Sequence, residues 1–175
     1  DGRNEDRQIF DVQGNKAEVT AVRLRREFPS LAVFSVAEFV TPQNIRTIIR
    51  SKDIVLLGVD KHAVRKLVFN RCRELQNVTL ISAGNDLVDG SVMVYIRKQG
   101  KDVTNPLRLH PEIQFPNDKN PGEDPSCLAQ AAAGEPQLVI TNMAAALGMA
   151  MMLFQILGGQ VPAEEIYFNI GDGVF

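Results

Sequence analysis

One stretch decides the fold: Asp53-Ile54-Val55-Leu56-Leu57-Gly58-Val59-Asp60. Its nearly continuous aliphatic run is typical of a strand covered on both faces. Residues from about 61 to 75 follow with helical spacing, and their apolar stripe is Val64, Val68, Cys72 and Leu75. A second apolar strand is expected over residues 78–83, ending at Gly84. Strands alternating with helices of this length predict an α/β domain with a mostly parallel sheet.

Upstream of that stretch, residues 16–28 show a helical period, and Pro29 ends the pattern. The apolar face of this helix is Ala17, Ala21, Leu24 and Phe28. A short strand is expected over residues 31–36. Thr41-Pro42 then predicts an N-cap and a first-turn proline, so a brief helix follows.

Downstream, residues 91–96 alternate apolar and other side chains, which predicts an antiparallel or edge strand with one wet face. Residues 104–126 carry five of the nine prolines, so we expect a long extended crossover loop. Residues 138–157 are strongly apolar but interrupted by polar side chains without charged flanks. They predict a core or interface helix rather than a membrane span. A last strand is expected over residues 165–170.

Composition limits the class of protein. With 175 residues, 45% of them hydrophobic and 23% charged, the chain predicts one domain over residues 1–175 that can bury a core. A net charge of -2 provides no basic field for nucleic acid. Cys72 and Cys127 lie far apart and form no Cys-x-x-Cys pair, which argues against a disulfide scaffold and a four-cysteine zinc site and favours a cytoplasmic protein.

Three charged residues together suit nucleotide chemistry: Arg7, Lys16 and Asp60. Transfer of a phosphate or adenylyl group needs cations against phosphate oxygens and a carboxylate that holds Mg²⁺. Lys16 also begins a helix, where backbone N–H groups add positive potential. Asp60 is expected at the carboxyl end of a central strand, where open α/β sheets bind ligands. Each alone is more typical of a surface charge or a helix cap, so the prediction depends on the three acting together.

Ordered motifs across most of the chain resemble the ThiF/MoeB/HesA family of ubiquitin-activating-like adenylating enzymes, whose fold is a Rossmann-like sheet flanked by helices with an antiparallel extension. The motifs are Asn4-x-x-Arg7-Gln8, Gly14-x-Lys16, Asp60 with Arg65, Asn70-x-Cys72, Ile81-Ser82-Ala83-Gly84, Gly90 and Gly158-Gly159. Pro125-Ser126-Cys127 and the segment after it are most similar to ThiF-type proteins of the plasmid-associated PRTRC system.

The resemblance implies a reaction in which ATP and the C-terminal carboxylate of a small ubiquitin-like or sulfur-carrier protein give an acyl-adenylate and pyrophosphate. It implies that Arg7 and Lys16 contact the phosphates, with Asn4 and Gln8 as polar support. It also implies a homodimer, which we expect to form through the apolar helix at residues 138–157.

The remaining roles are implied in the same way. Asp60 would hold Mg²⁺ or orient the nucleotide, and Asp1 would bind the ribose hydroxyls. Arg65 is either a structural ion pair or a ligand contact. Cys127 is either a nucleophile that forms a thioester or persulfide, or a structural thiol, whereas Cys72 is expected in the core.

The departures from the family leave other functions open. The glycine-rich loop and the strand before it are absent from this sequence, which opens on Asp1 without a methionine, so we expect a longer chain. Lys61 follows Asp60 where the family commonly has Asn. One alternative is a catalytically inactive nucleotide-binding or scaffold subunit. Another is a dinucleotide-dependent oxidoreductase, although no Gly-x-Gly-x-x-Gly supports it.

Overall fold

The computed structural model describes residues 14–117 and 139–174. The chain forms two compact units, Asp1–Val40 and Thr41–Phe175. Each unit is described separately below.

The described part of the N-terminal unit is one helix and an extended segment. Helix α1 spans Lys16–Glu27, as predicted, and Asn15 caps it by accepting a hydrogen bond from the N–H of Ala17 at 2.9 Å. Residues 31–36 form no strand, so that prediction was wrong. Phe34 is 86% exposed there. A β-prone segment becomes a strand only where a neighbouring strand supplies hydrogen-bond partners, and none pairs with it among the described residues.

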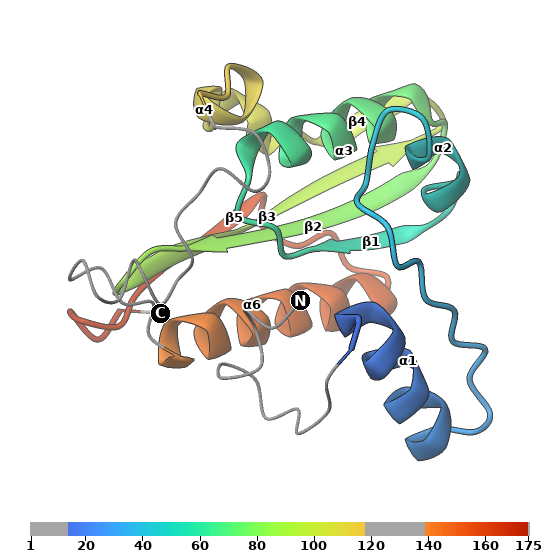
Figure 1. The fold of residues 1–175 in the computed structure, drawn as a ribbon. Helices are drawn as coiled ribbons and strands as arrows, with labels where there is room; N and C mark the ends of the chain where they lie inside the picture. The colour runs from blue at the N-terminus through green and yellow to red at the C-terminus, as the bar shows by residue number, and fades with distance from the viewer. Residues whose placement is uncertain (1–13, 118–138, 175) are drawn as a thin grey trace. The chain divides into compact units, whose positions relative to one another are not determined.

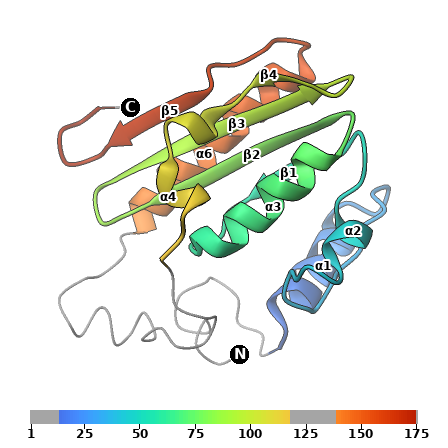
Figure 2. The same ribbon diagram turned by 90° about the horizontal axis from the view of Figure 1, so that it is seen from above.

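The second unit is built on a five-stranded sheet with the order β1-β2-β3-β4, in which β5 also pairs with β3 (Figures 1 and 2). The strands are β1 (Ile54–Leu57), β2 (Val78–Asn85), β3 (Asp89–Lys98), β4 (Lys101–Thr104) and β5 (Glu165–Asn169). Strand β5 lies beside the first half of β3 and β4 beside its second half. The predicted α/β class, with an open sheet between helices and an antiparallel extension, is confirmed.

The antiparallel part is larger than expected. Of the pairings among the described strands, β1 with β2 is parallel and the three made by β3 are antiparallel. A tight turn joins β2 to β3, in which Asp86 N–H donates to the carbonyl of Asp89 at 2.9 Å. So short a connection returns the chain in the opposite direction, because a parallel neighbour needs a long crossover.

Helices cover both faces of this sheet, α3 on one and α6 on the other (Figure 1). The helices are α2 (Ile45–Ile48), α3 (His62–Glu74), η2 (Pro106–Arg108), α4 (Pro111–Gln114) and α6 (Val139–Leu157). The short helices η2 and α4 begin with Pro106 and Pro111, inside the segment that we expected to be extended. A proline in the first turn suits a helix, so proline content alone did not exclude regular structure.

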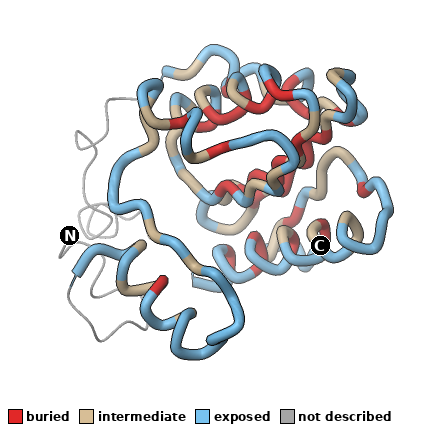
Figure 3. Tube along the Cα trace, turned by 90° about the vertical axis from the view of Figure 1, so that its right-hand side faces the viewer, coloured by how far each residue is buried: buried red, intermediate tan, exposed pale blue. Residues whose placement is uncertain are grey.

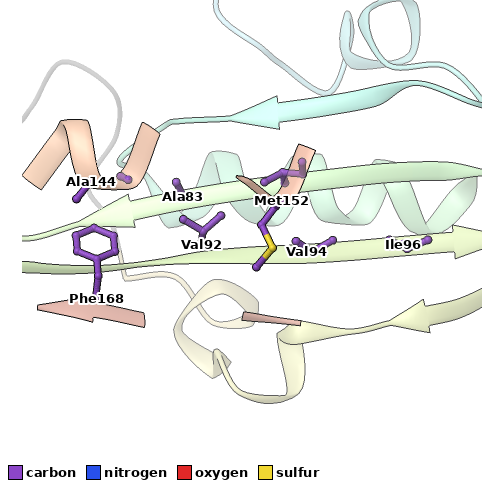
Figure 4. Close-up of a cluster of buried hydrophobic side chains, with 9 residues drawn as sticks. Ala83, Val92, Val94, Ile96, Ala144, Met152 and Phe168 are labelled. Carbon is purple, nitrogen blue, oxygen red and sulfur yellow. The ribbon is translucent and has the colours of Figure 1, made fainter. Parts of the chain in front are cut away.

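The main core lies between α6 and the sheet (Figure 4). Its buried members are Ile81, Ala83, Val92, Val94, Ile96, Ala144, Ala145, Met152 and Phe168. On the opposite face, Phe69 of α3 packs against Tyr95 with ring centroids 5.8 Å apart. Strand β3 is therefore buried on both faces and central. Of the two predicted alternatives, an antiparallel or an edge strand, the antiparallel one is confirmed, but the predicted wet face was wrong.

Strand β1 is less buried than its sequence predicted, whereas β3 is more buried. Ile54 and Leu56 are 41% and 52% exposed, although the aliphatic run indicated cover on both faces. Among the described strands β1 pairs with β2 alone, so it lies at the edge of the sheet rather than at its centre. A run of aliphatic residues reports side-chain type, and the number of neighbouring strands decides burial.

Helix α6 packs one side on the sheet, which confirms a core helix, and exposes the other (Figure 3). Ala144, Gly148 and Met152 face the core, whereas Met143 and Phe154 are 65% and 79% exposed. Among the described helices α6 is the one that is long and apolar enough to cross a membrane, which is weak evidence by itself.

Candidate functional site

The candidate site is a cavity of about 370 Å³ in the second unit, beyond the carboxyl ends of β1 and β2 and beside the first turn of α3. This is the edge of a parallel strand pair at which α/β sheets bind ligands. Polar and charged side chains from several elements line it. They include Asp60, His62, Arg65, Asn85, Asp86, Asp89, His110, Glu112, Glu165 and Tyr167.

Asp60 lines this cavity and lies three residues after β1 ends at Leu57. Its side chain is exposed, and no described residue donates a hydrogen bond to its carboxylate. Within the described part of the chain, both carboxylate oxygens are therefore available to a ligand. The position beyond a strand end agrees with the sequence prediction, although among the described strands β1 lies at the edge and not at the centre.

Arg65 lines the same cavity and is buried, with 5% of its surface exposed. Its Nε donates to the carbonyl of Val59 at 2.9 Å, and its Nη2 donates to the carbonyl of Ala83 at 2.8 Å. Its Nη1 also contacts Ser82 Oγ at 3.5 Å. The guanidinium thus joins the ends of β1 and β2, a role that the sequence did not predict.

A glycine makes room for that guanidinium. A Cβ on Gly84 would lie 2.6 Å from Nη2 of Arg65, closer than side-chain atoms approach one another. A side chain at position 84 would therefore force the guanidinium of Arg65 to shift. The sequence contained Gly84 and Arg65 in two separate motifs, with no signal that they touch.

His110 connects two walls of the cavity. Its Nδ1 lies 2.7 Å from Glu112 Oε1, and its Nε2 lies 2.8 Å from Glu165 Oε1. Burial opposes ionisation of Glu112, but hydrogen bonds from its own backbone N–H and from His110 outweigh it and lower the pKa of this carboxyl. Glu112 is near His110 in sequence, but Glu165 was not predictable as a partner.

The described donors match one mode of Mg²⁺ binding. No group of three or more His, Cys, Asp or Glu among the described residues is arranged to hold a metal ion. Mg²⁺, however, is commonly bound by one or two carboxylates together with substrate phosphates and water. An exposed aspartate to which no side chain or N–H of the described residues donates, as at Asp60, fits that mode and not an all-protein cage.

Lys16 is the first residue of α1, and its side chain is exposed. It lines an open cavity of about 560 Å³ formed within the N-terminal unit. Lys16 and Asp60 belong to different units, so the structure describes them separately.

The other predicted site residues lie outside the described residues: Asp1, Asn4, Arg7, Gln8 and Cys127. Their roles stay predictions. Cys72, by contrast, is confirmed in the core: it is 0% exposed, and burial raises the pKa of its thiol to about 12. Such a thiol is not a nucleophile at neutral pH.

Comparison with family models matches residues 2–170 to the model described as ThiF family. The matched range includes every motif quoted above and the whole described sheet. No curated protein matches the chain.

Proposed function

This chain belongs to the ThiF family, and from that premise we propose that residues 1–175 are a single adenylation domain acting on the C-terminal carboxylate of a small ubiquitin-like or sulfur-carrier protein. In this reaction a carboxylate oxygen of the carrier bonds to the α-phosphorus of ATP, the bond to the β-phosphate oxygen breaks, and pyrophosphate leaves. The exposed Asp60 carboxylate at the carboxyl ends of β1 and β2 carries the proposal.

Each proposed ligand contact follows from the charge that it would meet. Asp60 would hold Mg²⁺, which supplies charge neutralisation along the triphosphate when bound. Arg7 and Lys16 would contact the phosphates, because a planar fork and a point charge are the two cations that proteins use there. Asn4 and Gln8 would support those contacts through hydrogen bonds. Asp1 would accept hydrogen bonds from the ribose hydroxyls.

The charge of the described cavity supports a requirement for Mg²⁺. Five carboxylates line it, together with the buried Arg65 guanidinium and two histidine rings. The carboxylates are those of Asp60, Asp86, Asp89, Glu112 and Glu165. A triphosphate without a metal would be repelled by such a lining. We therefore propose that ATP enters this site as its Mg²⁺ complex, with Asp60 as the protein ligand.

The test is ATP–pyrophosphate exchange by the intact chain with its carrier protein. We expect Lys16→Ala and Asp60→Ala each to lower exchange by about 100- to 1,000-fold, the usual effect of losing a group that stabilises developing charge. Lys101→Ala and Asp172→Asn are matched controls, because both side chains are exposed outside the cavity. Exchange that is unchanged in Lys16→Ala and Asp60→Ala would contradict the proposal.

Measurements of ATP binding and of NAD binding, made beside the exchange assay, separate the alternatives. ATP binding without exchange would indicate a catalytically inactive nucleotide-binding or scaffold subunit. Tight NAD binding would indicate a dinucleotide-dependent oxidoreductase instead. Cys127 enters the proposal only as a candidate acceptor of the activated carboxylate: its thiolate would bond to the acyl carbon, AMP would leave, and a thioester would form, in a cytoplasmic setting that keeps thiols reduced.

A further inference from the structure

Resting on the proposed role of Asp60, we propose that Arg65 is the positioning residue that aims this carboxylate at Mg²⁺-bound ATP, and that Gly84 is glycine in order to admit Arg65. Neither residue needs to touch the nucleotide. Both act through the main chain that carries Asp60.

The first step is the bond from Arg65 to Val59. Its Nε donates to the Val59 carbonyl at 2.9 Å, and that carbonyl belongs to the peptide unit joining Val59 to Asp60. Because a peptide unit is planar, holding its oxygen also orients the backbone at which Asp60 begins. The bond therefore limits the directions that the exposed Asp60 side chain can take.

The second step is the anchorage of the guanidinium itself. The parallel register of β1 and β2 ends at the pair Leu57 and Ser82. Just beyond it, Arg65 bonds Val59 on one strand end and Ala83 on the other. Arg65 thus replaces the missing hydrogen-bond ladder where the two strand ends would otherwise move independently. Asp60 is held against β2, which pairs with strands on both sides, rather than left on a free loop.

The third step is that only arginine provides this geometry. The acceptors lie on different segments, and the planar fork reaches them with separate N–H groups of one rigid plane. A lysine at position 65 would keep the charge but bond them less completely. Arg65→Lys is accordingly a change of geometry at constant charge.

The fourth step comes from the glycines on either side. A Cβ at position 84 would meet Arg65 at 2.6 Å (Nη2), 3.0 Å (Nη1) and 3.1 Å (Cζ). A Cβ at Gly58, two residues before Asp60, would meet nothing within 4 Å. Gly84→Ala therefore displaces Arg65 of α3 through a substitution made in a different element, strand β2. Gly58→Ala alters the Asp60 segment without displacing it and is the matched control.

The experiment measures the ATP dissociation constant of the full chain with and without Mg²⁺, for the wild type and each variant. We expect Arg65→Lys and Gly84→Ala to reduce the tightening of ATP binding by Mg²⁺ by about 10- to 100-fold, the range seen when a residue that orients a metal ligand is lost. Gly58→Ala should keep the wild-type value. A general loss of fold would instead weaken ATP binding equally with and without Mg²⁺ and would lower the Tm.

A double-mutant cycle shows whether Arg65 acts through Asp60. In an Asp60→Asn background, Arg65→Lys should cause no further loss of the Mg²⁺ effect, because the group that it positions is gone. Additive losses would overturn the inference, as would an Arg65→Lys or Gly84→Ala variant with the wild-type Mg²⁺ effect. If Arg65→Lys does not fold, Gly84→Ala decides. A wild type that binds ATP without any Mg²⁺ effect overturns the proposed role of Asp60 and this inference with it.

Discussion

Strands β1 and β3 are each unlike their sequence pattern, and in opposite directions. The continuous aliphatic run of β1 indicated burial on both faces, yet Ile54 and Leu56 are largely exposed. The alternating pattern of β3 indicated a wet face, yet Val92 to Ile96 are all buried. The difference lies in their neighbours: β1 pairs with one described strand, and β3 with three. Position in the sheet, and not residue pattern, decided which strand is covered.

The same truncation in the two strands tests this comparison most strongly. We expect Ile96→Ala in β3, where the side chain is 3% exposed, to lower the free energy of unfolding by about 2–5 kcal/mol, because it leaves a cavity. Ile54→Ala in β1, where the side chain is 41% exposed, should lower it by no more than about 1 kcal/mol. Urea unfolding of both variants gives the two values. Equal losses would show that β1 is covered in the whole protein.

A hydrogen bond at β3 provides a second test, with an effect of about 1–3 kcal/mol. The hydroxyl of the buried Tyr95 donates to Asp102 Oδ1 at 2.7 Å, and Arg97 bonds the same carboxylate. Burial raises the pKa of Tyr95 to about 12. Asp102→Ala leaves the buried hydroxyl without this acceptor, so the unfolding free energy at pH 7 should fall by that amount.

The pH dependence of this contribution has a definite sign. Burial opposes ionisation of Asp102, but the hydrogen bonds from Tyr95 and Arg97 outweigh it, so the folded-state pKa lies below the unfolded value of about 4. The stabilisation is therefore fully present above about pH 4 and is lost as the pH falls through the folded-state pKa. Wild type and Asp102→Ala should accordingly converge in unfolding free energy at low pH. A constant difference from pH 7 to pH 2 would contradict this assignment.

The smallest expected effect concerns the apolar surface that α6 leaves open. Leu56 of β1 pairs with Ile81 of β2, so the two side chains are on the same face of the sheet. This is the face on which α6 packs. We expect a homodimer through the exposed side of α6, and Phe154→Ser should weaken it about tenfold or more, since buried aromatic side chains dominate interfaces. Light scattering over a concentration series measures the change. Phe115→Ser is the matched control, because Phe115 is similarly exposed at the end of α4. A wild type that is monomeric at micromolar concentration would contradict the homodimer.

Local signals were sufficient for much of the fold. The period of residues 16–28 with Pro29 predicted α1, and the stripe ending at Leu75 predicted α3. The aliphatic run also predicted that Asp60 lies just beyond a strand, because a strand followed at once by a helix places the connecting residue at the strand's carboxyl end. Each of these predictions depends on residues within one or two turns of each other.

The rest depended on residues far apart in the chain. The strand predicted over residues 31–36 did not form, because strand formation needs a partner that no local pattern supplies. The contact of His110 with Glu165 spans 55 positions, and that of Arg65 with Ala83 spans 18. Neither pair has a spacing rule that a sequence can show.

By itself the sequence determined the α/β class and most of the helices. Its ordered motifs indicated the family, and its aliphatic run indicated an aspartate just after a strand. Helix caps, hydrophobic periods and helix-breaking residues act between near neighbours, which is why the sequence alone was enough to predict them. The tertiary structure alone decided that β1 is an edge and β3 the centre among the described strands, and that Arg65 holds the peptide before Asp60 through space left by Gly84. Those outcomes are contacts between separate elements, and they exist only once the sheet has assembled.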